Sequence, residues 1–440
     1  MRRFRKFAVF MAFAAPALSA ASTAIASSLE KELRTIVYDH PEVRAGQNAV
    51  EASRMGIDKA RAGYLPKISM SGDVGTERID NPSTRSSTPG GKTWSRTHNI
   101  AGLTISQNLY NGNLTQSTYK KAQLATSVAQ LTLEGTRQNT LFQGTVSYIN
   151  VLRQRRLIEL SRNNEINIHR QLNLEDERVQ RGSGIAVDVL QAKSRLQLSK
   201  ERRVSFEGQL EDAVSTYTQN FNHAPDIDAM TDPEPPIEMI PSDLETAIRV
   251  AREKNPAISN SGANIEVARE SKQAVMSEYS PVVDMVSSWN YEKHKNSTLG
   301  TRRDYNVGVR ANWDLFTGFT TQAGLAQAAY DYSASMDNFD LATRKVIEQT
   351  RLSWQALVTA RERLTLLENA VNIAGEVYDS RKKLREAGKE TVINVLDAES
   401  EVNNAQINFT TASYDEMIAV YQLMLSMGQL SPAYLSMEDG

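Results

Sequence analysis

The stretch LYNGNLTQ (residues 109–116) returns in outline as LFTGFTTQ (residues 315–322), 206 residues further along the chain. Both read Leu, an aromatic residue, any residue, Gly, three residues and Gln. An alternating segment precedes each stretch, and a long run rich in Ala, Leu, Gln and Glu follows it. Because glycine at such a boundary is a turn signal, we expect each stretch to join a strand to a helix.

Two further pairs of matches show that this stretch belongs to a longer repeat. The pattern Gly-(x)5-(Asp/Asn)-Val-Leu occurs at residues 182–190 and 388–396, again 206 residues apart. Tyr-x-Pro occurs at residues 64–66 and 279–281, 215 residues apart, so the first copy carries nine extra residues before residue 109. Three matches in one order indicate an internal duplication and hence a quasi-symmetric structure.

The composition argues against several classes of function. Of the 440 residues 23% are charged and the net charge is −2, which gives no broad electrostatic case for nucleic-acid binding. The chain has no cysteine, and its five histidines are scattered without the spacing of metal ligands. No motif of a nucleophile and its base is present. We therefore expect no enzyme, no metal and no cofactor.

The first 26 residues read as a signal peptide. Four basic residues near the start are followed by an apolar run at residues 7–18 and by the small-x-small site Ala24-Ile25-Ala26. The alternative, a membrane-anchor helix, is weaker because the apolar run is short for a span of about 20 residues. No uninterrupted apolar span follows, so an exported chain that enters a membrane is expected to do so as a barrel.

Proline usage predicts very long helices. There is no proline between Pro89 and Pro225 or between Pro281 and Pro432. Helices are expected at about residues 113–181 and 319–387, each about 100 Å long at 1.5 Å per residue. Return helices are expected at about 187–221 and 391–428.

Apolar residues in the return helices recur every seven residues, which is typical of a coiled-coil seam. Arg203 and Glu416 interrupt the pattern, so ordinary packing in a helix bundle remains the alternative. The members are Val189, Leu196, Leu210 and Tyr217 in the first copy and Val395, Val402, Phe409 and Leu423 in the second.

Alternating apolar and polar residues predict β-hairpins at about 66–109 and 281–315. Each strand has about the ten residues that a tilted transmembrane strand needs, although a soluble sheet with one face on a core would look similar. Aromatic residues at one end of the hairpins suggest a membrane-interface belt, with packing between helix and strand as the alternative. They are Tyr64, Tyr110, Tyr279 and Phe316. Four strands cannot close a barrel, so we expect a ring of identical chains.

In this combination the sequence closely resembles the TolC-type outer membrane factors over nearly all of the chain after the signal peptide. The resemblance implies a mainly α-helical fold with a small β part. Its long coiled-coil hairpins would form an α-barrel, and four transmembrane strands per chain would close a 12-stranded β-barrel in a homotrimer. It also implies a place in the outer membrane of a Gram-negative bacterium, in contact with outer membrane lipid and extending into the periplasm.

The same resemblance implies an exit duct of tripartite drug efflux pumps or type I secretion systems, gated at its periplasmic end. The implied partners are a periplasmic adaptor (membrane fusion) protein and an inner-membrane transporter, and no nucleic acid. The alternative is a secreted periplasmic coiled-coil scaffold without a pore. The expected organisation is a first repeat at 27–221, a Pro-rich linker at 222–241 and a second repeat at 242–440 that ends in a tail.

The resemblance also assigns candidate gate residues around the second helical turn. The inward acidic positions match Asn394 and Asp397, so one ring of carboxylates is expected to become amides. The acidic position Asp188 would face Arg385 and Glu390, which replace a Tyr and an Arg of the family, and we expect an Arg385–Asp188 ion pair as the latch. The adaptor would dock on the turns that contain Gly182, Val189, Gly388 and Val395.

Overall fold

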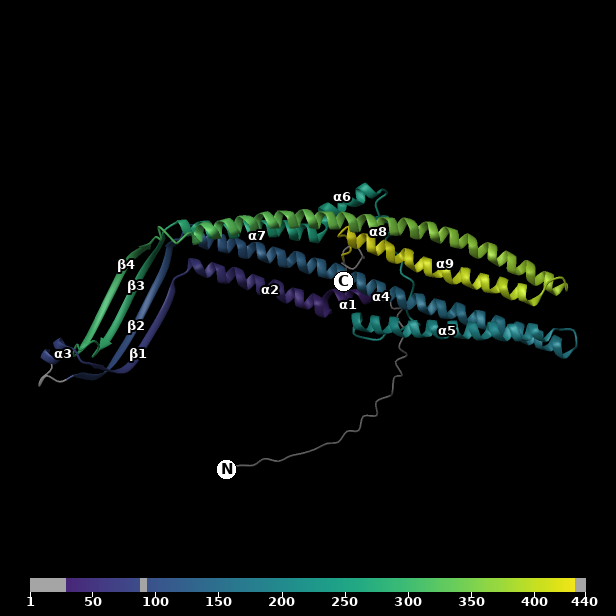
Figure 1. Cartoon of the computed structure of the whole chain (residues 1–440), viewed down its shortest axis with the longest axis horizontal. Coiled ribbons are helices and arrows are strands. Elements are labelled where there is room, and N and C mark those ends of the chain that lie inside the picture. Colours follow the sequence, from purple (N-terminus) through teal and green to yellow (C-terminus); the bar gives the residue numbers. More distant parts are fainter. Residues whose placement is uncertain (1–28, 88–92, 432–440) are drawn as a thin grey trace, which may run out of the picture.

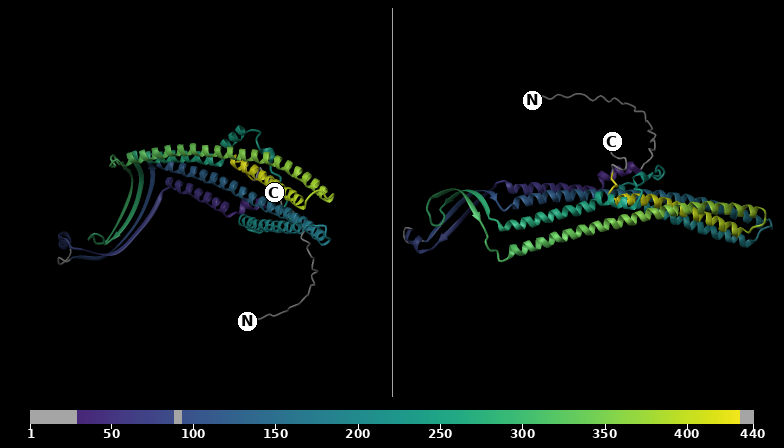
Figure 2. Two further views of the ribbon diagram at one scale, coloured as in Figure 1. Left: turned by 45° about the vertical axis from the view of Figure 1, so that its right-hand side comes forward. Right: turned by 90° about the horizontal axis from the view of Figure 1, so that it is seen from above.

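The computed structural model describes residues 29–87 and 93–431 of the chain. The predicted signal peptide and most of the predicted C-terminal tail lie outside these residues. The molecule is elongated, with four strands at one end and two helical hairpins whose turns lie at the opposite end (Figure 1). A second set of views shows both hairpins pointing to that same end (Figure 2).

The repeat predicted from the sequence is visible in the order and length of the elements. The first copy consists of α1 (Leu29–Asp39), α2 (Pro41–Arg61), η1 (Ala62–Tyr64), β1 (Lys67–Ile79), α3 (Pro82–Ser87), β2 (Trp94–Tyr110), α4 (Leu114–Gln180) and α5 (Ala186–Phe221). The second consists of α6 (Leu244–Lys254), α7 (Pro256–Met276), η3 (Ser277–Tyr279), β3 (Val282–Lys293), β4 (Thr301–Asn312), α8 (Thr320–Glu386) and α9 (Val392–Ser426). The linker between the copies contains η2 (Ile237–Met239).

Corresponding helices have matching lengths, because each copy repeats the same start and stop signals. α4 and α8 both have 67 residues, and α2 and α7 both have 21. Both shorter helices begin with proline, preceded by His40 or Asn255, whose side chain accepts a hydrogen bond from the second residue of the helix. Such a capped proline start favours a helix at this place. The short helix α3 lies in the segment where the first copy has its extra residues.

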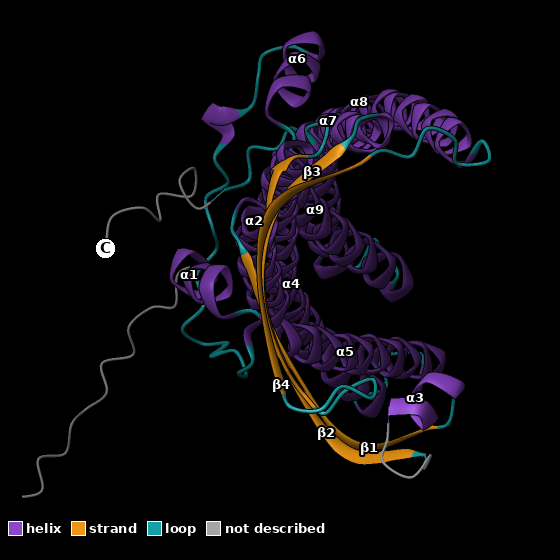
Figure 3. Cartoon of the chain, turned by 90° about the vertical axis from the view of Figure 1, so that its left-hand side faces the viewer, coloured by secondary structure: helices purple, strands orange, loops and turns teal. Residues whose placement is uncertain are grey.

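The four strands form one antiparallel sheet in the order β1-β2-β3-β4. The β2–β3 pairing joins the two copies, and its register shifts between Asn108 and Tyr110. Viewed along the long axis, the sheet and the helices follow an open arc (Figure 3). Within the described residues β1 and β4 each pair on one side only, so both edges of the sheet carry unpaired backbone groups.

The register places most of the apolar side chains of the sheet on one face and most of the polar ones on the other. Met70 lies opposite Leu103, Leu103 opposite Trp289, and Trp289 opposite Tyr305. Because residues directly opposite each other share a face, these side chains form one apolar face. Its exposed members include Ile68, Met70, Val74, Ile105, Met285, Tyr305, Val307 and Val309. The alternate positions carry Ser69, Ser71, Asp73, Thr104, Ser288, Asn290 and Asn306.

The main hydrophobic core lies midway along the molecule, where α1 and the linker cover α4, α5 and α9. Leu33, Leu141 and Leu423 are fully buried there. The hydroxyl of Tyr148 donates a hydrogen bond to the backbone oxygen of Thr231, at 2.9 Å, and accepts one from the Thr231 amide. These bonds hold the linker on the core without leaving the buried phenol unsatisfied.

No helix within residues 29–87 and 93–431 is both long and apolar enough to cross a membrane.

Candidate functional site

The two helical turns at the tip have the same backbone geometry. Gly182 has φ +76° and Gly388 has φ +71°, a left-handed conformation that glycine adopts at low cost. In the first turn the amides of Gly182 and Ser183 donate to the oxygens of Val179 and Arg178, and the second turn repeats this pattern. Both helices therefore end in a Schellman motif, which explains why glycine recurs at a spacing of 206 residues.

The turns differ in how the following helix starts. Thr391 caps α9, because its side chain accepts a hydrogen bond from the amide of Asn394 at 3.4 Å. Ile185 precedes α5 and offers no side-chain cap. Val189 and Val395, the apolar residues of the two motifs, are both buried where the return helices pack.

The predicted gate residue Asp397 is paired within the chain. Its Oδ1 lies 2.5 Å from a guanidinium nitrogen of Arg195 on α5. Asn394, three residues earlier, donates its side-chain amide to Glu390 Oε1. That bond and the amide of Thr391 hold the pKa of Glu390 below its ordinary value. The side-chain amide of Asn394 thus bonds to a neighbouring acid on its own turn.

The expected latch has a different acidic partner. Arg385 Nη2 lies 2.9 Å from Glu175 Oε2, and its Nη1 donates to the backbone oxygen of Glu390 at 3.1 Å. The side chain of Glu175 is 7% exposed and also accepts from Arg178, at 2.8 Å. Among the described residues Asp188 forms no ion pair. Within one chain, Arg385 therefore pairs with Glu175 rather than with Asp188.

A second buried carboxyl group lies beside this pair. Glu399 on α9 is 6% exposed, and its Oε2 accepts a hydrogen bond of 2.7 Å from Gln171 Nε2 on α4. The same nitrogen lies 3.4 Å from the hydroxyl of Tyr378 on α8. Gln171, Glu175 and Arg178 are spaced so that they share one face of α4. That face connects the first copy to the hairpin of the second.

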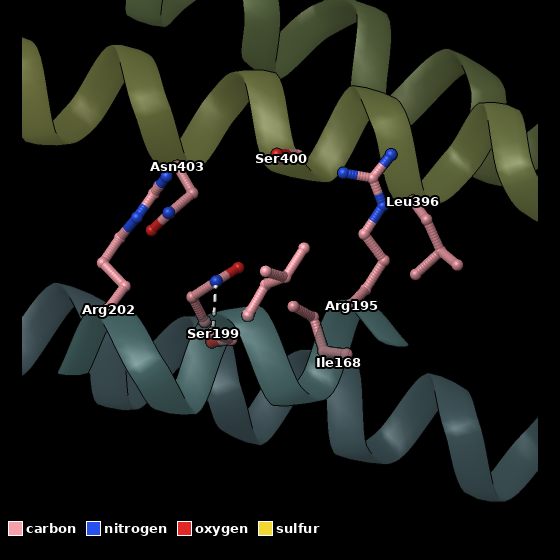
Figure 4. Close-up of a pocket in the computed structure, with 9 residues that line it drawn as sticks. Ile168, Arg195, Ser199, Arg202, Leu396, Ser400 and Asn403 are labelled. Carbon is pink, nitrogen blue, oxygen red and sulfur yellow. Dashed lines mark hydrogen bonds between the residues drawn. The ribbon is translucent and has the colours of Figure 1, made fainter. Parts of the chain in front are cut away.

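A seam between α5 and α9 lies further from the tip. Polar side chains bridge it, with Arg195 bonded to Asp397 and Arg202 bonded to Asn404 at 2.6 Å. A pocket of about 80 Å³ opens between these helices, lined by Ile168, Leu396 and Asn403 among others (Figure 4). A second pocket of about 270 Å³ opens between the same helices beside Leu198 and Ile393. Both volumes are below the roughly 300–1,000 Å³ of small-molecule sites, so we regard the seam as a packing contact between hairpins.

The strand-to-helix joints, which carry the LYNGNLTQ and LFTGFTTQ stretches, have equivalent bonds but different surroundings. Gln107 donates to the backbone oxygen of Tyr64, and its counterpart Trp313 donates to that of Tyr279, both at 3.1 Å. Gly112 and Gly318 have the same φ of +64°. An added Cβ at Gly112 would lie 2.5 Å from Ser280 Cβ, whereas one at Gly318 would meet nothing within 4 Å.

The four predicted interface aromatics lie at these joints. Tyr64, Tyr110 and Tyr279 are about half exposed and Phe316 is 75% exposed. Tyr64 packs edge-on against Tyr119, and Phe316 packs edge-on against Phe319. Their exposure is what a role at a membrane interface requires, and that role stays a prediction. In the described part of the chain no cluster of three or more metal-ligating side chains occurs.

Several residues of the site had no signal in the sequence. Glu175, Gln171, Glu399 and Arg195 lie within long helices that contain many similar charged residues. The partners of each pair lie more than 200 residues apart. Only the repeat spacing could have suggested that their helices meet, and it does not identify which side chains face one another.

Known proteins share this architecture. The sequence profile of the outer membrane efflux protein family matches residues 35–219 and 247–429. The outer membrane protein TolC of Vibrio cholerae is 23% identical over 439 residues, which cover 95% of each chain. The alkaline protease secretion protein AprF of Pseudomonas aeruginosa is 22% identical over 405 residues, covering 90% of this chain and 83% of AprF.

A solved structure agrees with these sequence matches. The outer membrane channel CmeC of Campylobacter jejuni superimposes with a TM-score of 0.78 at 14% identity, covering 91% of this chain and 85% of CmeC. This likeness confirms the predicted fold class. Because the profile matches both repeats and most of the chain, the protein belongs to the outer membrane efflux protein family.

Proposed function

We propose that three copies of this chain form a gated duct that receives its cargo from a periplasmic adaptor and an inner-membrane transporter. Membership of the family makes the chain an outer membrane exit duct for efflux or type I secretion. The observation that supports the trimer is the open sheet, which has one apolar face, one polar face and two unpaired edges. Unpaired backbone groups are very costly in lipid, so the edges need partners.

A ring of three copies would pair β4 of each copy with β1 of the next and close twelve strands. The apolar face would then contact lipid and the polar face would line the duct. A periplasmic scaffold without a pore is disfavoured, because within residues 29–87 and 93–431 much of the apolar face of the sheet is left uncovered. Met70, Val74 and Val309 are each at least 67% exposed.

The repeat also predicts the register between copies. Within the chain Leu103 on β2 lies opposite Trp289 on β3. The repeat spacing of 206 residues relates Leu103 to Val309 on β4, and the spacing of 215 residues relates Trp289 to Val74 on β1. We therefore expect Val309 to lie opposite Val74 of the neighbouring copy.

Cysteine cross-linking tests the ring directly, because the native chain contains no cysteine. The double variant Val309→Cys/Val74→Cys in the outer membrane should yield covalent dimers and trimers with a short thiol-specific cross-linker. The matched control Ile105→Cys/Ser287→Cys joins opposite residues of β2 and β3 and should cross-link within one chain. Efficient cross-linking of the control without any between copies would refute the ring.

We further propose that the tip turns act as gate and docking surface. The gate would comprise Asp188, Arg385, Glu390, Asn394 and Asp397, together with Glu175. Asp188 is partly exposed and lies on the turn, so a neighbouring copy can reach it. The adaptor would contact the turns around Gly182, Val189, Gly388 and Val395, where both glycines leave open space around the backbone.

A further inference from the structure

The carboxyl group of Glu399 occupies an unusual position for an acidic residue. It lies where α4, α8 and α9 meet, close to the tip, and only 6% of the residue is exposed. Its Oε2 accepts one hydrogen bond from Gln171, and its Oε1 has no hydrogen-bond partner among the described residues. An ionised carboxylate normally accepts several bonds, so this environment suits the neutral acid better.

The charged and titratable groups that face Glu399 come from both neighbouring helices. Arg170 on α4 and Lys382 on α8 are the cations, and Tyr378 on α8 is the other titratable group. Within the described residues neither cation forms an ion pair with Glu399. Burial is the largest influence and raises the pKa of Glu399 to about 7, while Gln171, Lys382 and Arg170 partly oppose it.

The sign of the resulting pH dependence follows from linkage. The pKa of an ordinary glutamic acid is 4.5, so the packed junction binds a proton that the free side chain releases. The packed arrangement therefore loses stability as the pH rises from 4.5 to about 7, and the loss is complete above about pH 7, where the buried group also carries its charge.

We propose that Glu399 is a gating residue that holds α9 against Gln171 of α4 as a neutral acid and releases the α8–α9 hairpin when its proton passes to water. Glu175 and Arg385 tie the same hairpin to the same face of α4, so the two contacts act on one movement. The inference rests on the proposed gated duct, and it assigns to the gate a residue outside the expected turn positions.

The test is the conductance of purified trimers in planar bilayers between about pH 6 and about pH 8, a window that brackets the transition. The open fraction of the native protein should rise with pH by up to about tenfold per unit below about pH 7 and level off above it. The variant Glu399→Gln keeps the size of the side chain but cannot ionise, so it should stay closed throughout. Glu401→Gln, at an exposed position of the same helix, should respond like the native protein.

A second measurement does not depend on conductance. The temperature at which trimers dissociate in detergent should fall between the same pH values for the native protein but not for Glu399→Gln. An unchanged pH response in Glu399→Gln, or none in the native protein, would overturn the role of Glu399. If Asp397→Asn abolishes the pH response and Glu399→Gln does not, the response belongs to the Asp397 carboxylates of the three copies instead. Trimers that never conduct would count against the proposed duct.

Discussion

The two long helices α4 and α8 have equal lengths and equivalent places in the repeat, yet they are covered very differently. Nineteen residues of α4 are buried but only seven of α8. α4 lies in the middle of the arc and contacts α2, α5, α7 and α9, whereas α8 lies at its edge (Figures 1 and 3). The two helices are equivalent in the repeat, so α8 leaves exposed much of the surface that α4 buries within the chain. We therefore expect a neighbouring copy to cover the exposed side of α8.

The largest expected effect compares the cores of the two helices. Leu141 on α4 is fully buried, so Leu141→Ala should destabilise the subunit by about 2–5 kcal/mol. Leu352 on α8 is 59% exposed in the chain, so Leu352→Ala should leave the subunit folded but weaken the trimer. Urea unfolding and the temperature of trimer dissociation separate the two effects. No change in trimer stability for Leu352→Ala would mean that no neighbour covers this part of α8.

The two strand-to-helix joints, at Gly112 and Gly318, are also equivalent in the repeat but differ in what surrounds them. Both glycines have positive φ, so alanine at either costs about 1 kcal/mol in strain. Gly112→Ala adds a clash with η3 and with Ser280, which follows it, worth about a further 1–3 kcal/mol. If η1 and β1 of a neighbouring copy cover Gly318, Gly318→Ala should weaken the trimer as much as Gly112→Ala does, in the same dissociation assay. A milder effect, equal to the strain alone, would show that the second joint stays open in the assembly.

A smaller effect is expected at the tip, where the chain links its two halves. Glu175→Gln removes the carboxylate shared by Arg178 and Arg385, a loss of about 2 kcal/mol for charge-assisted hydrogen bonds. The closed tip should then leak, which bilayer conductance or sensitivity to a large antibiotic measures. Glu177→Gln is the matched control, because that side chain is 60% exposed and its one ion pair among the described residues is with Arg181, which directly follows α4. Equal conductance of the two variants would remove Glu175 from the gate.

The smallest effect concerns the helix caps that distinguish the turns. Thr391→Ala removes the cap of α9 and should cost about 0.5–1 kcal/mol of local stability. Ile185→Thr supplies the missing cap to α5 and should gain a similar amount. Hydrogen exchange of the amides in the first turns of both helices reports these changes. Exchange that moves in the same direction in both variants would contradict the assignment of the caps.

Much of the architecture followed from local patterns. The absence of proline, the glycines at each turn and the alternation of apolar and polar residues act over a few neighbouring positions. These signals indicated long helices, hairpins and their duplication. The side-chain contacts at the tip were harder to predict, because the expected Arg385–Asp188 pair was transferred from a family position, while Arg385 pairs with Glu175 within this chain. Every long helix carries many charged residues, and the sequence alone does not show which of them form ion pairs.

The sequence by itself determined that this chain is built twice from one plan and cannot close a barrel alone. Periodicity and turn residues encode that plan locally. Counting the strands shows that one chain has too few to close a barrel, so its sheet keeps two unpaired edges. Only the tertiary structure decided which side chains meet across the copies: Glu175 with Arg385, Arg195 with Asp397, and Gln171 with Glu399. Such pairs depend on the rotation and relative shift of helices that are joined through distant parts of the chain, and no local rule specifies either quantity.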